Sequence, residues 1–307
     1  MRMPHQVTNL KAVDVKFSDT EISPEPADGV VDMSIGTFLR RARRLSDAQV
    51  DEIVAHQRRH GVRFGEAAVA LKLASNDDVL WALSQQFHYP YAGDEGTSFN
   101  PELVAAVDPF GIQAESIRAV RSQLLFDAMS PEQPRRPLAV LSTESGDGRS
   151  FFAANLAICF SQLGGRTLLV DADMRAPRQH ELFKVPNDKG LSGMLAGRIE
   201  DGAIHSVADL PSLFVLPVGT LPPNPIELLQ RSAFGALLRE LLTKFDHVVM
   251  DTPALAHGAD ARVIANRCGL CMIVARRGTT RLKPVDRLAT TLARPPGVFA
   301  GVVINDR

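Results

Sequence analysis

The chain of 307 residues is long enough for one large domain, or for a large and a small one. Its net charge of −1 gives no overall electrostatic basis for binding nucleic acid or an anionic membrane, so we expect no nucleic-acid partner. We find no apolar run of membrane-spanning length, and the polar N-terminal residues do not resemble a signal peptide. The three cysteines are expected to be buried thiols in a reducing compartment, including the pair at 268 and 271.

Composition divides the chain into four segments. Residues 1–32 are polar and are predicted to form a disordered leader. Residues 33–87 are rich in helix formers and are predicted to form a small helical module. Residues 88–111 hold three prolines and three glycines, which predicts a linker with one short helix. Residues 112–307 are predicted to form a large domain that opens with a helix over 112–130.

From residue 138 onward, short apolar runs alternate with longer helical patterns. This alternation predicts an α/β fold with a mostly parallel sheet, helices on both faces, and ligands beyond the carboxyl ends of the strands. The predicted strands are 138–142, 167–171, 213–218, 247–251, 270–275 and 298–304. The predicted helices lie near 150–163, 226–244, 260–266 and 284–293.

A glycine-containing turn, residues 146–150, joins the first predicted strand of the large domain to the helix that follows. A loop of this kind presents backbone N–H groups and a helix N-terminus to an anion, which predicts a phosphate site. Gly148 and Ser150 match the G-x-x-x-x-G-K-[ST] signature, whereas Thr143 replaces its first glycine and Arg149 its lysine. Arginine keeps the positive charge, so we expect phosphate binding to survive, although phosphoryl transfer depends more closely on where that charge lies.

Acidic residues follow two further predicted strands. Asp171 and Asp173 lie at the end of 167–171, and Asp251 ends 247–251. Carboxylates at these strand ends suit a magnesium ion that accompanies a bound triphosphate. A glycine turn alone is common without any ligand, but the agreement of three elements favours a nucleoside-triphosphate site.

Residues 112–307 resemble the bacterial tyrosine kinases of exopolysaccharide and capsule synthesis, which are P-loop proteins with deviant nucleotide-binding motifs. Besides the glycine loop, the resemblance rests on the acidic motif from Leu168 to Arg175, on Asp251-Thr252-Pro253, and on the closing segment from Val302 to Asn305. It implies a P-loop NTPase fold with ATP and Mg²⁺ as cofactors. It also implies ATP-dependent protein-tyrosine kinase activity in exopolysaccharide biosynthesis and chain-length control.

The resemblance also implies roles for individual residues. The catalytic set would be Asp173, as base toward the tyrosine hydroxyl, with Asp171 and Arg149. The magnesium ligands would be Ser150, Asp171 and Asp251. The nucleotide would be bound by Ser145, Gly146, Asp147, Gly148, Arg149, Ser150, Phe151 and Asn305.

An E-x-x-R-x-x-R pattern lies near the start of the large domain, at Glu115, Arg118 and Arg121. In the resembled family this pattern serves assembly into a homo-oligomer, whereas its spacing also suits a solvated ion pair on one helix. The family further implies a membrane polysaccharide co-polymerase whose cytoplasmic tail docks on the kinase. We therefore expect a cytoplasmic protein that is peripheral at the inner membrane through this partner.

Two departures from the family leave a second interpretation open. Arg149 replaces the lysine, and the sequence has two tyrosines, Tyr89 and Tyr91, with no tyrosine cluster at its end. A kinase would then act on one of these or on another protein. The alternative is a catalytically weak or non-kinase ATP switch that regulates the co-polymerase by assembly. A partition or division-site ATPase is disfavoured because Glu144 occupies the position of that group's additional lysine.

The helical module contains an internal repeat at an offset of 29 residues, which aligns Gly36 with Gly65 and Ser46 with Ser75. Each copy is predicted to be helix, turn and helix, with the two serines as N-caps. The module resembles the N-terminal domain of type II secretion and pilus-assembly ATPases, some of which bind cyclic di-GMP. That resemblance implies cyclic di-GMP as a regulator, while a duplicated helical hairpin that serves only packing is the alternative. The implied ligand residues are Gln57, Arg63, Gly65 and Gln86.

Overall fold

The computed structural model describes residues 35–43, 45–86, 99–198, 201–294 and 296–306. The predicted leader, residues 88–98 of the predicted linker, and both tyrosines lie outside the described residues. Within the described ranges, no helix is long and apolar enough to cross a membrane.

The small module is built from four described helices that share one core. They are α1 (Ile35–Arg43), α2 (Asp47–His60), α3 (Phe64–Ala70) and α4 (Asn76–Gln86). Helix α1 packs against α4, and α2 packs against α3. The core includes the buried side chains of Leu39, Ile53, Ala67, Ala68 and Ala82.

The repeat in the module is visible in its helix caps and its glycines. The hydroxyl oxygens of Ser46 and Ser75 accept from the backbone N–H groups three residues later, which confirms both predicted N-caps. A Cβ on Gly65 would lie 2.6 Å from Cγ1 of Val79, and one on Gly36 would lie 3.3 Å from the Phe64 ring. Close helix packing therefore accounts for both glycines without any ligand.

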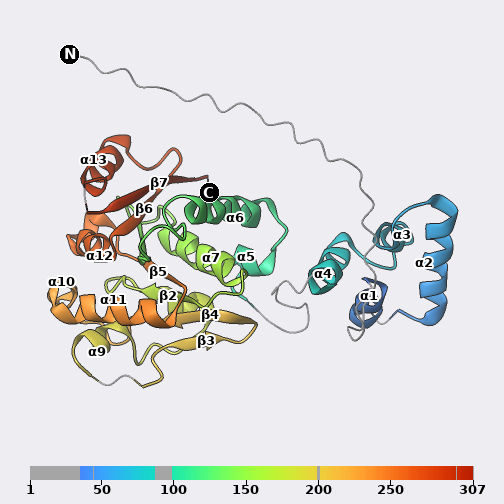
Figure 1. Ribbon diagram of the computed structural model, residues 1–307, viewed down its shortest axis with the longest axis horizontal. Coiled ribbons are helices and arrows are strands. Elements are labelled where there is room, and N and C mark those ends of the chain that lie inside the picture. The colour runs from blue at the N-terminus through green and yellow to red at the C-terminus, as the bar shows by residue number, and fades with distance from the viewer. Residues whose placement is uncertain (1–34, 44, 87–98, 199–200, 295, 307) are drawn as a thin grey trace, which may run out of the picture. The chain divides into compact units, whose positions relative to one another are not determined.

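The large domain is organised around a sheet of seven described strands in the order β3-β4-β2-β5-β1-β6-β7 (Figure 1). All neighbours are parallel except β3 and β4. Six predicted strands are confirmed, and the short antiparallel β3 at the sheet edge was not predicted. The bounds are β1 (Leu138–Leu141), β2 (Thr167–Asp171), β3 (His205–Val207), β4 (Leu210–Leu216), β5 (His247–Asp251), β6 (Leu270–Arg276) and β7 (Val298–Asn305).

Helices cover both faces of this sheet, because alternate side chains of the strands enter two separate cores. One core holds Val140 and Leu169 with α5 (Val104–Val107), α6 (Ile112–Phe126), α7 (Arg149–Ser161) and α8 (Gln179–Phe183). The other holds Leu141 and Val170 with α9 (Leu191–Leu195), α10 (Pro225–Gln230), α11 (Ser232–Lys244), α12 (Asp260–Cys268) and α13 (Leu282–Leu292). A 3-10 turn, η1 (Leu255–His257), follows β5. The predicted doubly covered α/β fold is confirmed, and all three cysteines are buried free thiols.

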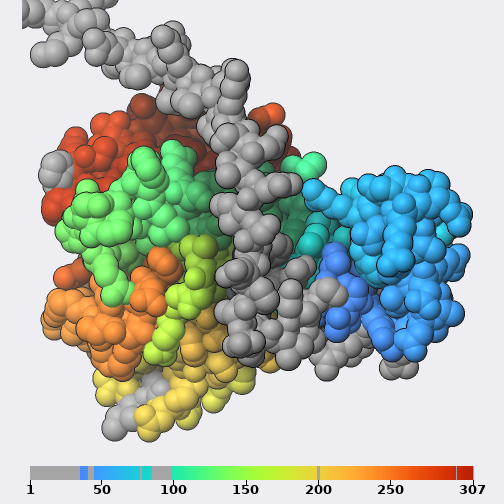
Figure 2. Space-filling view, turned by 45° about the vertical axis from the view of Figure 1, so that its right-hand side comes forward, coloured from blue at the N-terminus to red at the C-terminus, as the bar shows by residue number. Residues whose placement is uncertain are grey.

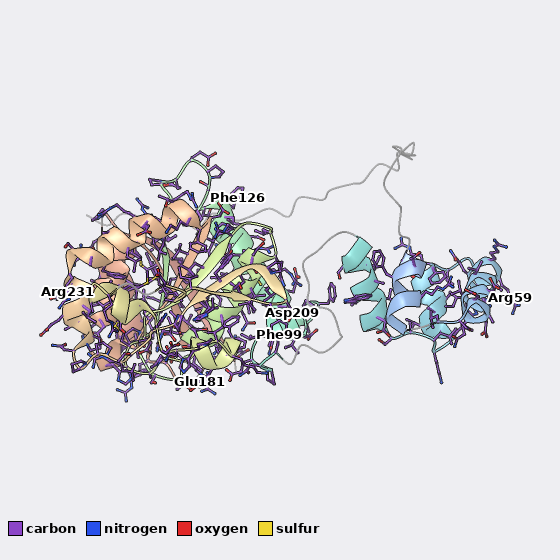
Figure 3. The ribbon with its side chains drawn as sticks, turned by 90° about the horizontal axis from the view of Figure 1, so that it is seen from below. Arg59, Phe99, Phe126, Glu181, Asp209 and Arg231 are labelled. Atoms are coloured by element: carbon purple, nitrogen blue, oxygen red, sulfur yellow. The ribbon has the colours of Figure 1, made fainter. Side chains whose placement is uncertain are left out.

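The helix predicted over 226–244 is wrong in one respect, because it is broken at Arg231. The backbone of Arg231 is extended, with ψ 151°, and the residue is both the C-cap of α10 and the N-cap of α11. Its side chain is exposed, and Figure 3 labels it at the edge of the domain. In a continuous helix, with a turn of about 100° per residue, Leu228 and Phe234 would point to different sides. The break lets both side chains enter the same core.

The described part of the predicted linker packs as part of the large domain. Val104, Ala105 and Ala106 of α5 are buried in the core beneath α7. The Asn155 side chain of α7 accepts from the Ala105 N–H at 2.9 Å and donates to the carbonyl of Glu102 at 2.8 Å. These bonds hold the start of the large domain against the helix that follows the phosphate loop.

Candidate active site

The phosphate loop connects β1 to α7 and depends on two glycines in the left-handed region. Gly146 has φ 84° and Gly148 has φ 96°, which side chains with a Cβ rarely adopt. Gly148 is also closely approached, because a Cβ there would lie 2.2 Å from Nδ2 of Asn305. The Asn305 amide, at the end of β7, donates to the Asp147 carbonyl at 3.1 Å. The structure therefore brings the predicted Asn305 onto the loop.

Asp147 organises the loop from within. One carboxylate oxygen accepts from the Glu144 N–H at 3.0 Å, and the other accepts from Oγ1 of Thr280 at 2.6 Å. The side chain is buried, so these bonds replace the water that a carboxylate needs. Thr280, which follows β6, was not among the residues predicted for the site. The sequence contained one indication that Thr280 could belong to the site, because this residue follows the carboxyl end of a predicted strand.

Arg149, at the lysine position of the loop, is buried and its guanidinium is bound by protein groups. Nε donates to the carbonyl of Thr252 at 2.7 Å, and Nη1 donates to the Ser142 hydroxyl and to the carbonyl of Glu144. Nη2 lies 3.5 Å from Oδ2 of Asp173. The planar group therefore links the ends of β1 and β5 and also faces the predicted base.

Asp171 and Asp251 face each other in register at the ends of β2 and β5. Both are buried. The Asp171 carboxylate accepts three backbone N–H groups, from Asp173 at 3.1 Å and from Arg178 and Gln179 at 2.9 Å each. Burial, and then the charge of Asp251, raise the pKa of Asp171 well above its ordinary value. Asp171 thus orders the segment between β2 and α8.

Asp251 has one engaged and one unpartnered oxygen. Oδ2 accepts from Nε2 of Gln179 at 2.7 Å, whereas the buried Oδ1 has no hydrogen-bond partner. Burial raises the pKa of Asp251, and this effect is opposed by Arg149 and by hydrogen bonds from Gln179 and Ser150. A buried carboxylate oxygen beside the Ser150 hydroxyl fits magnesium, which binds through one or two protein oxygens together with substrate phosphates.

Gln179, the first residue of α8, was missed by the sequence analysis. Its side chain is buried and reaches both Asp251 and the carbonyl of Ser150, the latter at 3.1 Å. No local pattern marks this residue, because its partners come from distant parts of the chain.

Asp173 lies at the wall of the cavity above the loop. Its Oδ1 accepts from the backbone N–H groups of Arg175 at 3.1 Å and Ala176 at 3.0 Å, which leaves Oδ2 facing Arg149. The cavity has a volume of about 370 Å³. It is lined by Glu102, Ser145, Gly146, Gly148, Arg149, Ser150, Phe151, Asp173, Ala176, Arg178, His257, Arg276 and Asn305.

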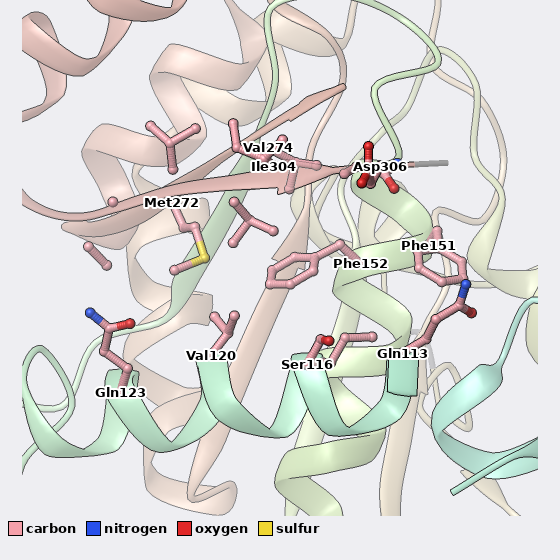
Figure 4. A pocket seen from close by; sticks show the side chains of 16 residues that line it. Gln113, Ser116, Val120, Gln123, Phe151, Phe152, Met272, Val274, Ile304 and Asp306 are labelled. Atoms are coloured by element: carbon pink, nitrogen blue, oxygen red, sulfur yellow. The ribbon is translucent and has the colours of Figure 1, made fainter. Parts of the chain in front are cut away.

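A larger cavity, of about 540 Å³, adjoins the first between α6 and the strands β6 and β7. Figure 4 shows Val120 and Gln123 of α6 on one side of it and Met272 and Val274 of β6 on the other. In Figure 2, the green surface that includes α6 borders the red surface of the C-terminal elements. Both cavities are lined by Phe151 and Asn305, so they meet at the start of α7.

The other predicted residues belong to α6 and to the small module. On α6, Glu115 forms an ion pair with Arg118 at 2.8 Å, and Arg121 donates to the Cys159 carbonyl at 2.8 Å. In the small module, Arg63 is exposed at the start of α3, and Gln57 is partly buried in α2. The module also contains Gly65, packed against Val79, and Gln86, the last residue of α4.

Known proteins resemble this chain in sequence and in fold. Residues 138–306 match the family model of the CobQ/CobB/MinD/ParA nucleotide binding domain. The tyrosine-protein kinase CpsD of Streptococcus agalactiae is 31% identical over 192 residues, which cover 62% of this chain and 81% of CpsD. The tyrosine-protein kinase wzc of Salmonella typhi is 33% identical over 204 residues, which cover 66% of this chain and 28% of wzc. The kinase domain of the Escherichia coli tyrosine kinase ETK has 32% identity and a TM-score of 0.64, covering 69% of this chain and 82% of that domain.

The fold and the glycine loop define a P-loop nucleotide-binding protein. The chain belongs to the bacterial tyrosine kinases, the protein-tyrosine kinases of capsule and exopolysaccharide biosynthesis.

Proposed function

We propose that this kinase transfers the γ-phosphoryl group of ATP to a tyrosine hydroxyl at the cavity above residues 145–151. The observation that carries the proposal is the convergence of Arg149, Asp171, Asp173 and Asp251 from three separate strand ends. Phosphoryl transfer is catalysed mainly by positioning and by charge stabilisation, which such a cluster supplies.

The nucleotide phosphates would lie against residues Ser145 to Phe151, at the N-terminus of α7. The nucleoside would extend toward Asn305, where the two cavities meet. Ser150 and Asp251 would hold Mg²⁺, with Asp171 beside them; when bound, the ion neutralises charge on the phosphates. We assign Asp173 as the base toward the tyrosine hydroxyl, because it lies at the cavity wall and faces Arg149.

The test is a phosphotyrosine assay on the protein with ATP, Mg²⁺ and a tyrosine-containing substrate. Asp173→Asn keeps an oxygen for the N–H groups of residues 175 and 176 but removes the base. We expect its rate to fall by about 10²–10⁴-fold, with ATP affinity retained. Asp286→Asn, an exposed change on α13, is the control and keeps the rate. An unchanged rate in Asp173→Asn would remove the assignment of the base.

One observation favours a second function, an ATP-driven assembly switch with weak or absent phosphate transfer. Arg149 replaces the usual lysine, and its guanidinium already donates to Thr252, Ser142 and Glu144. If the purified protein binds ATP and assembles, while no phosphotyrosine forms and Asp173→Asn assembles normally, the switch is the better description.

We also infer that the chain acts with other proteins at the inner membrane. Self-assembly through Glu115, Arg118 and Arg121 would place the kinase in a homo-oligomer, docked on the cytoplasmic tail of a polysaccharide co-polymerase. Support comes from the family and from the exposed carboxylate of Glu115 on α6. Sedimentation of wild type and Glu115→Ala, with and without a co-polymerase tail peptide, tests both contacts.

Cyclic di-GMP binding by Gln57, Arg63, Gly65 and Gln86 stays a prediction. The exposed guanidinium of Arg63 supports it, whereas the packing of Gly65 is explained without a ligand. Equilibrium binding of cyclic di-GMP to wild type and to Arg63→Ala tests this prediction. If wild type does not bind cyclic di-GMP at high micromolar concentration, the prediction is wrong.

A further inference from the structure

Gln179 connects three parts of the active site through one side chain. Nε2 donates to Oδ2 of Asp251 at 2.7 Å and to the carbonyl of Ser150 at 3.1 Å. Its own backbone N–H donates to Oδ2 of Asp171 at 2.9 Å. The residue is fully buried, so these bonds are made without competition from bulk water.

Two buried acceptors remain unpartnered at this position. They are Oδ1 of Asp251 and Oε1 of Gln179 itself. Buried polar atoms in folded proteins are nearly always hydrogen-bonded, so each calls for a donor that the protein does not provide. Water molecules bound to magnesium are such donors, and magnesium characteristically keeps several of its waters.

We infer that Gln179 is a positioning residue for the magnesium end of the site. Its Nε2 holds Asp251 in place for the ion, and its Oε1 accepts from a water molecule bound to the ion. This inference rests on the proposed function, because it presupposes that Ser150 and Asp251 hold Mg²⁺. Partners that orient metal ligands in this way typically account for about 10–100-fold in metal affinity.

The test is a magnesium titration of the full chain with ADP bound, followed by the fluorescence of a labelled ADP. Gln179→Met keeps the size of the side chain but removes both the donor and the acceptor. We expect the half-saturating Mg²⁺ concentration to rise about 10-fold or more, while ADP affinity in EDTA stays within about twofold of wild type. Gln179→Leu, a second variant that removes both the donor and the acceptor, is expected to raise the half-saturating concentration as well.

Gln162→Met is the matched control, because that side chain also donates from Nε2, to the Ala105 carbonyl at 3.0 Å, and also has an unpartnered Oε1. It lies at the opposite end of α7 and should leave the magnesium titration unchanged. The inference is overturned if folded Gln179→Met or Gln179→Leu titrates like wild type, or if Gln162→Met shows the same shift. If wild type binds no ADP or shows no magnesium dependence, the proposed function itself fails.

Discussion

Asp171 and Asp251 form an in-register pair of buried carboxylates at the ends of two neighbouring parallel strands, β2 and β5. Two such groups oppose each other's ionisation, and burial opposes the ionisation of both. Three backbone N–H groups donate hydrogen bonds that stabilise the ionised carboxylate of Asp171. The ionised form of Asp251 is stabilised instead by side chains from α7 and α8. A cation bound beside this pair would favour the ionised form of both carboxylates.

The first prediction concerns the pH dependence of stability. Because the pKa of Asp251 is raised, the folded protein keeps a proton that the unfolded chain releases above a pH of about 4. Stability without nucleotide should therefore fall as pH rises from this value toward the raised pKa. Asp251→Asn should show a smaller decline in melting temperature between pH 5 and pH 8. Asp286→Asn, on the surface, should follow wild type; an equal decline in all three proteins would contradict the prediction.

The second prediction concerns the two loop glycines. Gly148→Ala combines a strained φ with a Cβ placed 2.2 Å from the Asn305 amide. Gly146→Ala has a similar φ but open space around its Cβ. Each change should cost about 1–3 kcal/mol of unfolding free energy, with Gly148→Ala at the upper end. ATP binding, measured by calorimetry, should be lost in Gly148→Ala and weakened less in Gly146→Ala. Equal losses would show that the contact with Asn305 is unimportant.

The third prediction concerns the bond between Thr280 and Asp147. Thr280→Val removes the donor and leaves one oxygen of a buried carboxylate unpaired. This should cost about 1–3 kcal/mol in urea unfolding and should weaken ATP binding, because Asp147 also orders the loop through Glu144. Thr279→Val, at the exposed neighbouring position, is the control and should change neither quantity.

The fourth prediction concerns Arg149→Lys, which restores the usual residue of the signature. A single ammonium cannot reach Thr252, Ser142 and Glu144 together as the guanidinium does. The protein without nucleotide should lose about 1–3 kcal/mol of stability, because buried acceptors become unpaired. Phosphotyrosine formation is measured on the same samples. A gain in rate would show that the arginine limits transfer, while unchanged stability would contradict the structural role given to the guanidinium.

The fifth prediction concerns packing in the small module. A Cβ at Gly65 would collide with Val79 at 2.6 Å, whereas one at Gly36 would meet the Phe64 ring at 3.3 Å. Gly65→Ala should therefore destabilise the module by about 1–3 kcal/mol, and Gly36→Ala by less. Thermal unfolding followed by circular dichroism measures both. A larger loss of stability in Gly36→Ala than in Gly65→Ala would contradict the prediction, because it would show that the helices separate more easily at α3 than the structure implies.

The order of elements, the α/β class and the acidic strand ends were predictable from the sequence. Apolar periodicity, glycine turns and capping serines such as Ser46 and Ser75 act over a few residues, so a short window of sequence contains their cause. Asp171, Asp173 and Asp251 were predicted to meet because parallel strands share one carboxyl edge, and the structure brings them together.

The tertiary structure alone decided which side chains complete that cluster. Gln179 and Asp251 are 72 positions apart, Arg149 and Thr252 are 103 apart, and Thr280 and Asp147 are 133 apart. No periodicity relates such residues, because their contact follows from the strand order and from how far each loop extends beyond its strand. The break at Arg231 has the same origin, since the shape of the core, not helix propensity, determines where that helix must end.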